Sequence, residues 1–243
     1  MVGENMISNK EVKEIASDLG ADLCGVASVE RFDGAPQGFH PEDIFPDTKS
    51  VIVIARRFPE GPFHSSSPVP YTAVSDSILN DVIRISCDLC IELERNDGLI
   101  AVPVPSEPYE YWDDDKKEGR GILSLKHAGL LVGLGSIGRN HLLVNEKYGN
   151  RIVLGAVLLN IELESDQVND QRFCDDNCNL CIDSCPASAI SEAGVNQKLC
   201  RGNSGYLNKK GYFLYVCNAC RKVCPNGAGI KFSFIAELPL DNL

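Results

Sequence analysis

The chain has 243 residues, 44% of them hydrophobic, and a formal net charge of −11. This is enough for one sizeable core plus a small second domain, and the excess of acids argues against a nucleic-acid backbone as the main partner, although a small basic patch could still face an RNA substrate. Because no run of about 18 apolar residues occurs and the polar N-terminus has no signal pattern, we expect a cytoplasmic protein without a membrane span.

The first 160 residues predict alternating helices and strands, which is typical of an α/β layer architecture. Helical spacing of apolar residues predicts helices over 8–19, 75–95 and 122–134. Strands are predicted over 21–29, 50–55, 98–104 and 151–160; the runs SVIVIA and RIVLGAVLLN indicate strands covered on both faces. The segments 56–71 and 105–121 predict loops, the first rich in Pro, Ser and Gly, the second acidic and aromatic.

The glycine-rich segment Gly133–Gly138 matches the G-x-G-x-x-G dinucleotide pattern. The residues before it suit a helix ending at glycine, and those after it suit a loop and a strand. We therefore favour a glycine-lined loop that approaches some other cofactor. A nicotinamide-dependent reductase remains the minor alternative.

From residue 164 onward cysteines become dense and Asp, Asn and Gly interrupt any periodicity. We place a domain boundary there, between an α/β domain over 1–163 and a second domain over 164–243. Two cysteine runs lie in the second domain. They are Cys174-x3-Cys178-x2-Cys181-x3-Cys185-Pro186 and Cys217-x2-Cys220-x3-Cys224-Pro225, with Cys200 upstream of the second.

The C-x2-C-x3-C-P spacing is typical of bacterial ferredoxins, in which the cysteine before proline ligates the other cluster. This rule predicts two [4Fe–4S] clusters in a ferredoxin-like domain. The predicted ligands are Cys174, Cys178, Cys181 and Cys224 for the first cluster, and Cys185, Cys200, Cys217 and Cys220 for the second. A zinc site or a set of buried thiols is the alternative. For Cys24, Cys87 and Cys90 we favour packing over a redox C-x2-C pair.

A family resemblance joins these observations. The segment KHAGLLVGLGSIGRNHLLVNEKYGNRIVLGAVLLN at 126–160, followed by the double cluster motif, resembles the epoxyqueuosine reductase family, iron–sulfur proteins related to corrinoid reductive dehalogenases. LGADLCGVASVERF and SVIVIA also resemble the opening strands of that family. The resemblance covers nearly the whole chain, which looks like a short member without the C-terminal repeats of longer ones.

The resemblance implies a nitroreductase-like α+β N-terminal domain that holds a corrinoid such as cobalamin, with one cluster close to the cobalt. It also implies that an epoxide on a queuosine precursor in tRNA is reduced with electrons passed through the clusters. By the motif match, the corrinoid side would be lined by Ser136, Asn140, His141 and Leu142, with 148–150 nearby.

The catalytic acid is the main departure from the family. Where its tRNA-modifying members have an Asp-Ser-type segment, this chain has PVPSEPYEYWDDDKKEG. Glu107, Asp113, Asp114 and Asp115 are nearby acids, and none aligns, so the catalytic residue is left unknown. Three adjacent aspartates are more often a solvated loop than a catalytic group.

Two functions remain. One is a reductase that passes electrons through two clusters to a site in the N-terminal domain; the other is a ferredoxin-type carrier that serves a separate enzyme. A carrier needs no large α/β domain, which favours the reductase. We expect a small electron-donor protein such as a ferredoxin or a flavodoxin as partner, with a basic rim to suit this acidic chain. The substrate is left open, tRNA included.

Overall fold

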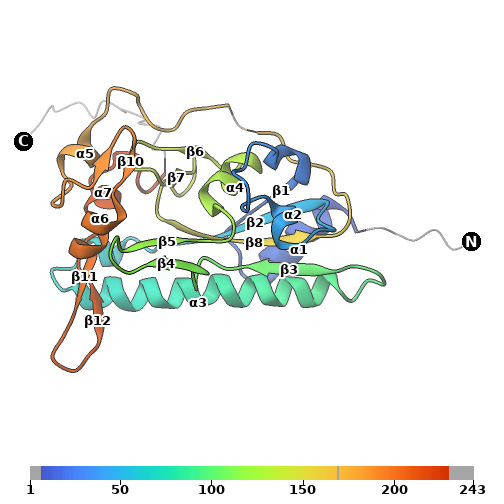
Figure 1. The fold of residues 1–243 in the computed structure, drawn as a ribbon, viewed down its shortest axis with the longest axis horizontal. Helices are drawn as coiled ribbons and strands as arrows, with labels where there is room; N and C mark the ends of the chain where they lie inside the picture. The colour runs from blue at the N-terminus through green and yellow to red at the C-terminus, as the bar shows by residue number, and fades with distance from the viewer. Residues whose placement is uncertain (1–6, 169, 230–243) are drawn as a thin grey trace, which may run out of the picture.

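The computed structural model describes residues 7–168 and 170–229. Residues 1–6 of the predicted first domain, and 169 and 230–243 of the predicted second one, lie outside the described part. A mixed α/β architecture is present, with a central sheet, helices on both of its faces and a cysteine-rich part at one end (Figure 1). No described helix is long and apolar enough to cross a membrane.

The sheet has four antiparallel strands in the order β1-β2-β8-β3. They are β1 (Leu23–Ser28), β2 (Ser50–Arg57), β8 (Ile152–Leu159) and β3 (Ala101–Val104). All four were predicted. In β2, Ile52 and Ile54 pack in one buried cluster and Val51 and Val53 in another. Both faces are therefore covered, as the continuous apolar runs predicted.

One face is covered by α1 (Asn9–Asp18) and the long α3 (Pro68–Leu93). A reciprocal capping box between Ser8 and Glu11 starts α1. Helix α3 begins seven residues earlier than predicted. The Pro-rich composition there indicated a loop, but proline is tolerated in the first turn of a helix, and the Ser67 side chain caps this one.

The other face is covered by α4 (Leu125–Leu131) and the short η1 (Val29–Phe32), with α2 (Pro41–Ile44) beside η1; η2 (Gly61–His64) lies against α3. The predicted loop 105–121 is wrong in part, because it contains a hairpin of β4 (Tyr111–Asp113) and β5 (Glu118–Arg120). Arg201, from the cysteine-rich part, fixes this hairpin, since its guanidinium lies over the rings of Tyr109 and Trp112. That contact is tertiary and has no local sequence signal.

The cysteine-rich part consists of short elements. They are α5 (Leu180–Asp183), β9 (Ile190–Ser191), β10 (Gly194–Val195), α6 (Gln197–Ser204), β11 (Gly205–Leu207), β12 (Phe213–Tyr215) and α7 (Ala219–Lys222). Helices α5 and α7, each beside a cysteine motif, pack against one another.

The chain enters this part along the edge of the sheet. Asp166 pairs with the backbone of Val26 in both directions, and the Ser165 hydroxyl accepts from Ser28 N. The segment thus covers the open edge of β1. A second contact joins the cysteine-rich part to the segment before β8. Gly149 lies so close to the backbone of Asn226 and Gly227 that a side chain has no room there. The division into domains at 163–164 stays a prediction.

Candidate functional site

The four cysteines predicted for the first cluster line one small cavity. Its wall consists of Cys174, Cys178, Cys181 and Cys224, together with Asn140, Val144, Leu180 and Pro225. The packing of α5 on α7 brings the two distant motifs together here. The backbone N–H of Arg139 also points at Cys174 Sγ, 3.5 Å away, and such hydrogen bonds to sulfur are one means by which a protein adjusts cluster potentials.

What distinguishes these thiols from packing residues is that four of them lie together. Burial raises the pKa of both Cys181 and Cys224, and the neighbouring cysteines of the same set raise it further. Thiolates gathered in one partly buried place repel each other, so their ionised form needs a compensating cation. Iron supplies that charge, so the donor set fits a thiolate-ligated cluster.

The second predicted set also comes together. The Cys200 thiol interacts electrostatically with Cys217 and Cys185, and the Cys220 thiol with Cys200 and Cys217. Burial raises the pKa of Cys220 to about 11. No three His, Cys, Asp or Glu side chains in the described ranges converge as a single metal ion requires. A cubane takes one thiolate per iron, so its ligands surround a volume rather than a point. The ligand assignment stays a prediction.

The other three cysteines lie elsewhere. Cys24 is on β1 and Cys90 on α3, both packed in or against the core cluster, and burial raises the pKa of each to about 12. Cys87 is exposed. The C-x2-C pair on α3 is therefore split between core and solvent, which agrees with a packing role for Cys24 and Cys90.

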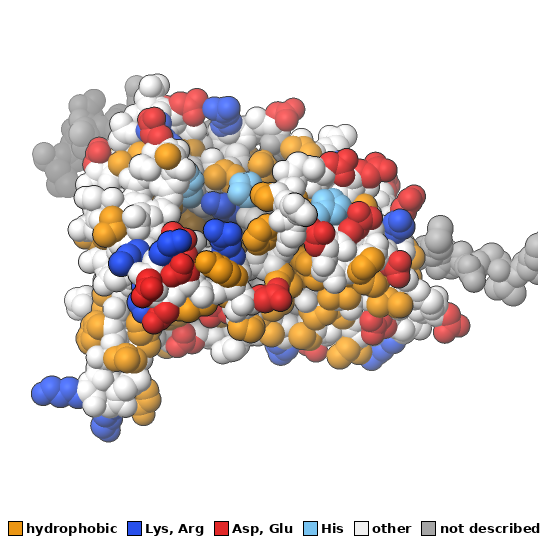
Figure 2. All heavy atoms as spheres, viewed as in Figure 1, with side chains coloured by type: hydrophobic (Ala, Val, Ile, Leu, Met, Phe, Trp, Pro, Cys, Tyr) orange, Lys and Arg blue, Asp and Glu red, His pale blue; other side chains and the backbone are white. Residues whose placement is uncertain are grey.

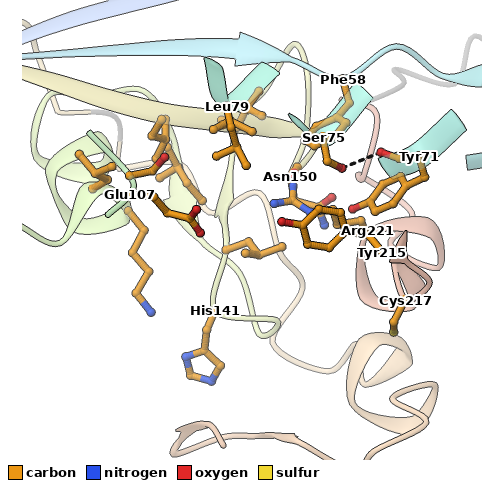
Figure 3. Close-up of a pocket in the computed structure, with 18 of the residues that line it drawn as sticks. Phe58, Tyr71, Ser75, Leu79, Glu107, His141, Asn150, Tyr215, Cys217 and Arg221 are labelled. Carbon is orange, nitrogen blue, oxygen red and sulfur yellow. Dashed lines mark hydrogen bonds between the residues drawn. The ribbon is translucent and has the colours of Figure 1, made fainter. Parts of the chain in front are cut away.

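A cavity of about 460 Å³ lies between α3, the strand β8 and the cysteine-rich part (Figure 3). Its apolar wall includes Phe58, Leu79, Leu142, Leu143 and Leu154. Cys217, from the second cluster set, lines the same cavity. The volume is in the range of small-molecule and cofactor sites.

Two buried polar side chains at this cavity have no partner. Asn150 is fully buried, and neither atom of its side-chain amide makes a hydrogen bond; the Ser106 hydroxyl is likewise buried and unpaired. Buried polar groups in proteins are almost always paired. A donor and acceptor pair at Asn150 and a hydroxyl at Ser106 suit a bound molecule with a polar rim, and the amide-bearing edge of a corrinoid is of that kind.

Ionisable groups also reach the cavity. Glu107 and Lys126 both line it, and burial lowers the pKa of Lys126. Burial raises the pKa of Tyr215, and the Glu107 carboxylate is the largest of the charged neighbours that raise it further. Figure 3 shows Glu107, Asn150 and Tyr215 around a common space. The cavity therefore has three groups, Glu107, Lys126 and Tyr215, that can exchange protons with a molecule bound there.

Of the four acids considered from the sequence, only Glu107 lines the cavity. Asp113 and Asp114 are on the β4–β5 hairpin, where they form ion pairs with lysines of the same hairpin. The backbone N–H of Lys116 lowers the pKa of Asp113, and the Lys117 ammonium lowers that of Asp114. These aspartates form a solvated turn.

Three of the four residues predicted for the corrinoid side line one of the two cavities. Leu142 and His141 line the large one, although the His141 ring turns away from its centre (Figure 3) and its Nε2 lies 2.8 Å from Ser191 O. Asn140 lines the cluster cavity instead, and the Ser136 hydroxyl accepts from Phe173 N at 3.0 Å. Whether these residues contact a corrinoid stays a prediction.

The glycine segment has no dinucleotide geometry. It follows α4, not a strand, and Gly133 ends that helix with φ +79°. A small hairpin of β6 (Ser136–Ile137) and β7 (Leu143–Val144) comes next, where the fingerprint requires a helix. This agrees with the preference for a glycine-lined loop.

No protein-family model matches the sequence. An epoxyqueuosine reductase from Bacillus cereus is 30% identical over 270 residues, covering 96% of this chain and 68% of the relative. A second match, to the Lactococcus garvieae epoxyqueuosine reductase, is 34% identical over 120 residues but covers only 45% of this chain and 34% of the relative. In these two matches the chain thus spans about two thirds and about one third of the relative's length.

Two solved structures share the fold. An epoxyqueuosine reductase with an epoxyqueuosine-modified tRNA-Tyr stem loop aligns with a TM-score of 0.60 at 21% identity, over 90% of this chain and 64% of that one. A reductive dehalogenase, whose structure suggests a mechanism for B12-dependent dehalogenation, aligns with a TM-score of 0.57 at 18% identity, over 90% of this chain and 32% of that one.

Proposed function

The chain belongs to the epoxyqueuosine reductase family, and from this premise we propose that it is a reductase. Electrons pass through two [4Fe–4S] clusters, held by the two predicted cysteine sets, to a corrinoid in the cavity of about 460 Å³. One observation carries the proposal: Cys217 lines the same cavity as the unpaired Asn150. An iron–sulfur cluster and a cofactor-sized cavity are then neighbours.

The domain arrangement is part of the proposal. Residues 1–163 form a nitroreductase-like domain that supplies most of the cavity, and 164–243 form the ferredoxin-like domain with both clusters. The likeness of fold to an epoxyqueuosine reductase and to a reductive dehalogenase, along about nine tenths of this chain, supports this. The alternative, a ferredoxin-type carrier, does not account for the cavity or its unpaired polar groups.

When bound, a corrinoid supplies a cobalt centre that can donate electrons or act as a nucleophile. The protein orients it. The Asn150 amide and the Ser106 hydroxyl are placed to hydrogen-bond its polar rim, and the apolar wall around Leu142 and Leu154 keeps water from its face.

The substrate class we propose is an epoxide on a modified tRNA nucleoside, by analogy with the relative solved with an epoxyqueuosine-modified tRNA stem loop. Converting an epoxide to an alkene consumes two electrons and two protons and releases water. The clusters are the source of the electrons. Glu107 and Lys126 are two of the groups in the cavity that can deliver protons.

The test is anaerobic reconstitution followed by titration with cob(II)alamin, with the cobalt EPR signal as the readout. A stoichiometric shift to a base-off spectrum supports the reductase. No shift in a protein with both clusters assembled contradicts the corrinoid and leaves the carrier as the better account. An iron content near zero after reconstitution contradicts the cluster assignment itself.

A further inference from the structure

The charge of residues 193–229 is opposite to that of the whole chain. The segment contains six lysines and arginines and no aspartate or glutamate, although the chain has a net charge of −11. It also contains Cys200, Cys217 and Cys220, three of the ligands proposed for the second cluster. The segment that supplies these ligands therefore carries a local excess of positive charge, although Asp76 of α3 lies beside the hairpin.

Four of these six cations are available to a partner. Arg201 donates to the Tyr109 hydroxyl, and Arg221 donates to the Asn150 carbonyl, so both are occupied within the fold. The other four are exposed lysines, and none forms an ion pair with a residue in the described ranges: Lys198, Lys209, Lys210 and Lys222.

Two of the lysines are held at the tip of a projecting hairpin formed by β11 and β12. The Asn208 side chain accepts from the N–H groups of Lys210 and Tyr212, which makes the turn a defined structure. At the base, Tyr215 N donates to the Thr72 hydroxyl of α3 at 2.9 Å. Figure 1 shows the hairpin extending past α3, and Figure 2 shows basic side chains at its end.

The same segment exposes an unusual amount of apolar surface. Six large side chains on it are between 44 and 66% exposed: Leu199, Tyr206, Leu207, Tyr212, Phe213 and Val216. Exposed apolar groups with a charged rim are typical of protein interfaces. We call Lys198 to Cys200 together with the hairpin 205–216 the basic hairpin surface.

We propose that the basic hairpin surface docks an acidic one-electron carrier protein, which reduces the second cluster through Cys200; this cluster exchanges electrons with the first one and passes them on to the large cavity. The inference rests on the proposed function, because it requires that cluster. In each transfer the carrier loses one electron and the oxidised cluster gains it, and no bond is made or broken. Cys200 is exposed, between Leu199 and Arg201 on α6, so a docked carrier approaches a cluster ligand directly.

The first cluster set offers the opposite surroundings. Asp175 and Asp176 lie between its first two cysteines, and Asp183 follows the third. Arg172 pairs with Asp176, whereas Asp175 and Asp183 add negative charge beside this set, so it attracts an acidic carrier less than the lysines near Cys200 do. The partner expected from the net charge alone, one with a basic rim, is thus the reverse of what this surface fits.

An RNA is the other polyanion that a basic surface can attract. Three of the six exposed apolar side chains, Tyr206, Tyr212 and Phe213, carry rings on which a base can stack, whereas Leu199, Leu207 and Val216 are aliphatic and give it no such ring. They suit the apolar contacts of a protein interface better. RNA binding at this surface is therefore treated as an outcome of the test that contradicts the proposal.

The experiment uses the full reconstituted chain and two probes of opposite charge, an acidic flavodoxin and a basic c-type cytochrome. Binding is measured by biolayer interferometry between 20 and roughly 300 mM salt, a range over which screening removes surface attraction. Cluster reduction by flavodoxin hydroquinone is followed by stopped flow. The test variant is Lys209→Glu with Lys210→Glu. The matched control is Lys10→Glu with Lys49→Glu, which makes the same charge change at exposed sites outside the segment.

We expect the wild type to bind the flavodoxin with an affinity that falls as salt rises. The hairpin variant should bind the flavodoxin about tenfold more weakly, and flavodoxin should reduce its clusters about tenfold more slowly. The control variant and reduction by dithionite should be unchanged. Three results would overturn the proposal. They are equal flavodoxin binding by wild type and hairpin variant, preferred binding of the cytochrome, and binding of a tRNA stem loop in place of flavodoxin at this surface. Because binding is measured separately from iron content and cobalt EPR, failure of the docking is distinct from failure of the reductase.

Discussion

The two cysteine motifs share a spacing and differ in their surroundings. The first places Cys174, Cys178 and Cys181 beside Asn140 and Leu180, in a small cavity apart from the large one. The second supplies Cys217 and Arg221 to the wall of the large cavity. The residues inserted between Cys200 and Cys217 form the exposed β11–β12 hairpin. Two sets of cysteine ligands with the same spacing can thus differ in function, because different residues surround each of them.

The strongest test of this difference is loss of one ligand in each set. We expect Cys217→Ser to abolish turnover, to lower the iron content from about eight to about four per chain and to alter cofactor binding, because this residue lines the large cavity. Cys178→Ser should lower the iron content equally but leave cob(II)alamin affinity unchanged. Iron assay and cobalt EPR check both. Equal effects of the two variants on cofactor affinity would remove the distinction between the motifs.

The next effect concerns proton delivery in the large cavity. Replacement of Glu107 by Gln keeps its size and removes the acid, so turnover should fall about a hundredfold, the usual range for a general acid. Asp114→Asn is the matched control on the solvated hairpin and should leave turnover within a factor of two or so. Single-turnover assays with an epoxide substrate measure both. A larger loss in the Asp114 variant would contradict the assignment.

Lys126 gives a pH test at the same site. Burial lowers the pKa of this lysine, so its ammonium loses its proton below the usual lysine value of 10.5. If Lys126 delivers a proton, activity falls as pH rises through the lowered pKa. The Lys126→Met variant should lack that alkaline decrease in a pH–rate profile. An unchanged profile would show that the lysine has no part in proton delivery.

A smaller effect is expected for Asn150→Leu, which replaces an unpaired buried amide with an apolar side chain of similar size. Cob(II)alamin affinity should fall about tenfold through the lost hydrogen bonds. The free energy of unfolding without cofactor should be unchanged or about 1 kcal/mol higher, because an unsatisfied polar group has been removed. EPR titration and urea unfolding measure the two. Unchanged affinity would mean that Asn150 does not face the cofactor.

Local patterns in the sequence were sufficient for the sheet. The run SVIVIA becomes β2, because a continuous apolar run suits a strand whose two faces are both buried. The four cysteines predicted for the first cluster line one small cavity, and their assignment as ligands stays a prediction. The start of α3 was missed because proline normally marks a loop, whereas here it occupies a first turn.

The large cavity could not be derived in the same way. Asn150 was near the predicted cofactor side, but its lack of a hydrogen-bond partner depends on residues from α3, α7 and the 106–109 segment. Glu107 and Asp114 look equally acidic in the sequence. Only the fold shows that one lines a cavity while the other binds Lys117 on an exposed turn.

The central claim, that the second cluster and the cofactor are neighbours, is tested most directly by magnetic coupling. Protein loaded with cob(II)alamin is reduced until the clusters become paramagnetic, and the relaxation of the cobalt EPR signal is recorded in the wild type, Cys178→Ser and Cys217→Ser. We predict that cluster reduction speeds cobalt relaxation in the wild type and in Cys178→Ser, and that this effect is lost in Cys217→Ser. Cobalt relaxation that is independent of cluster reduction, or that is lost only in Cys178→Ser, would contradict the account.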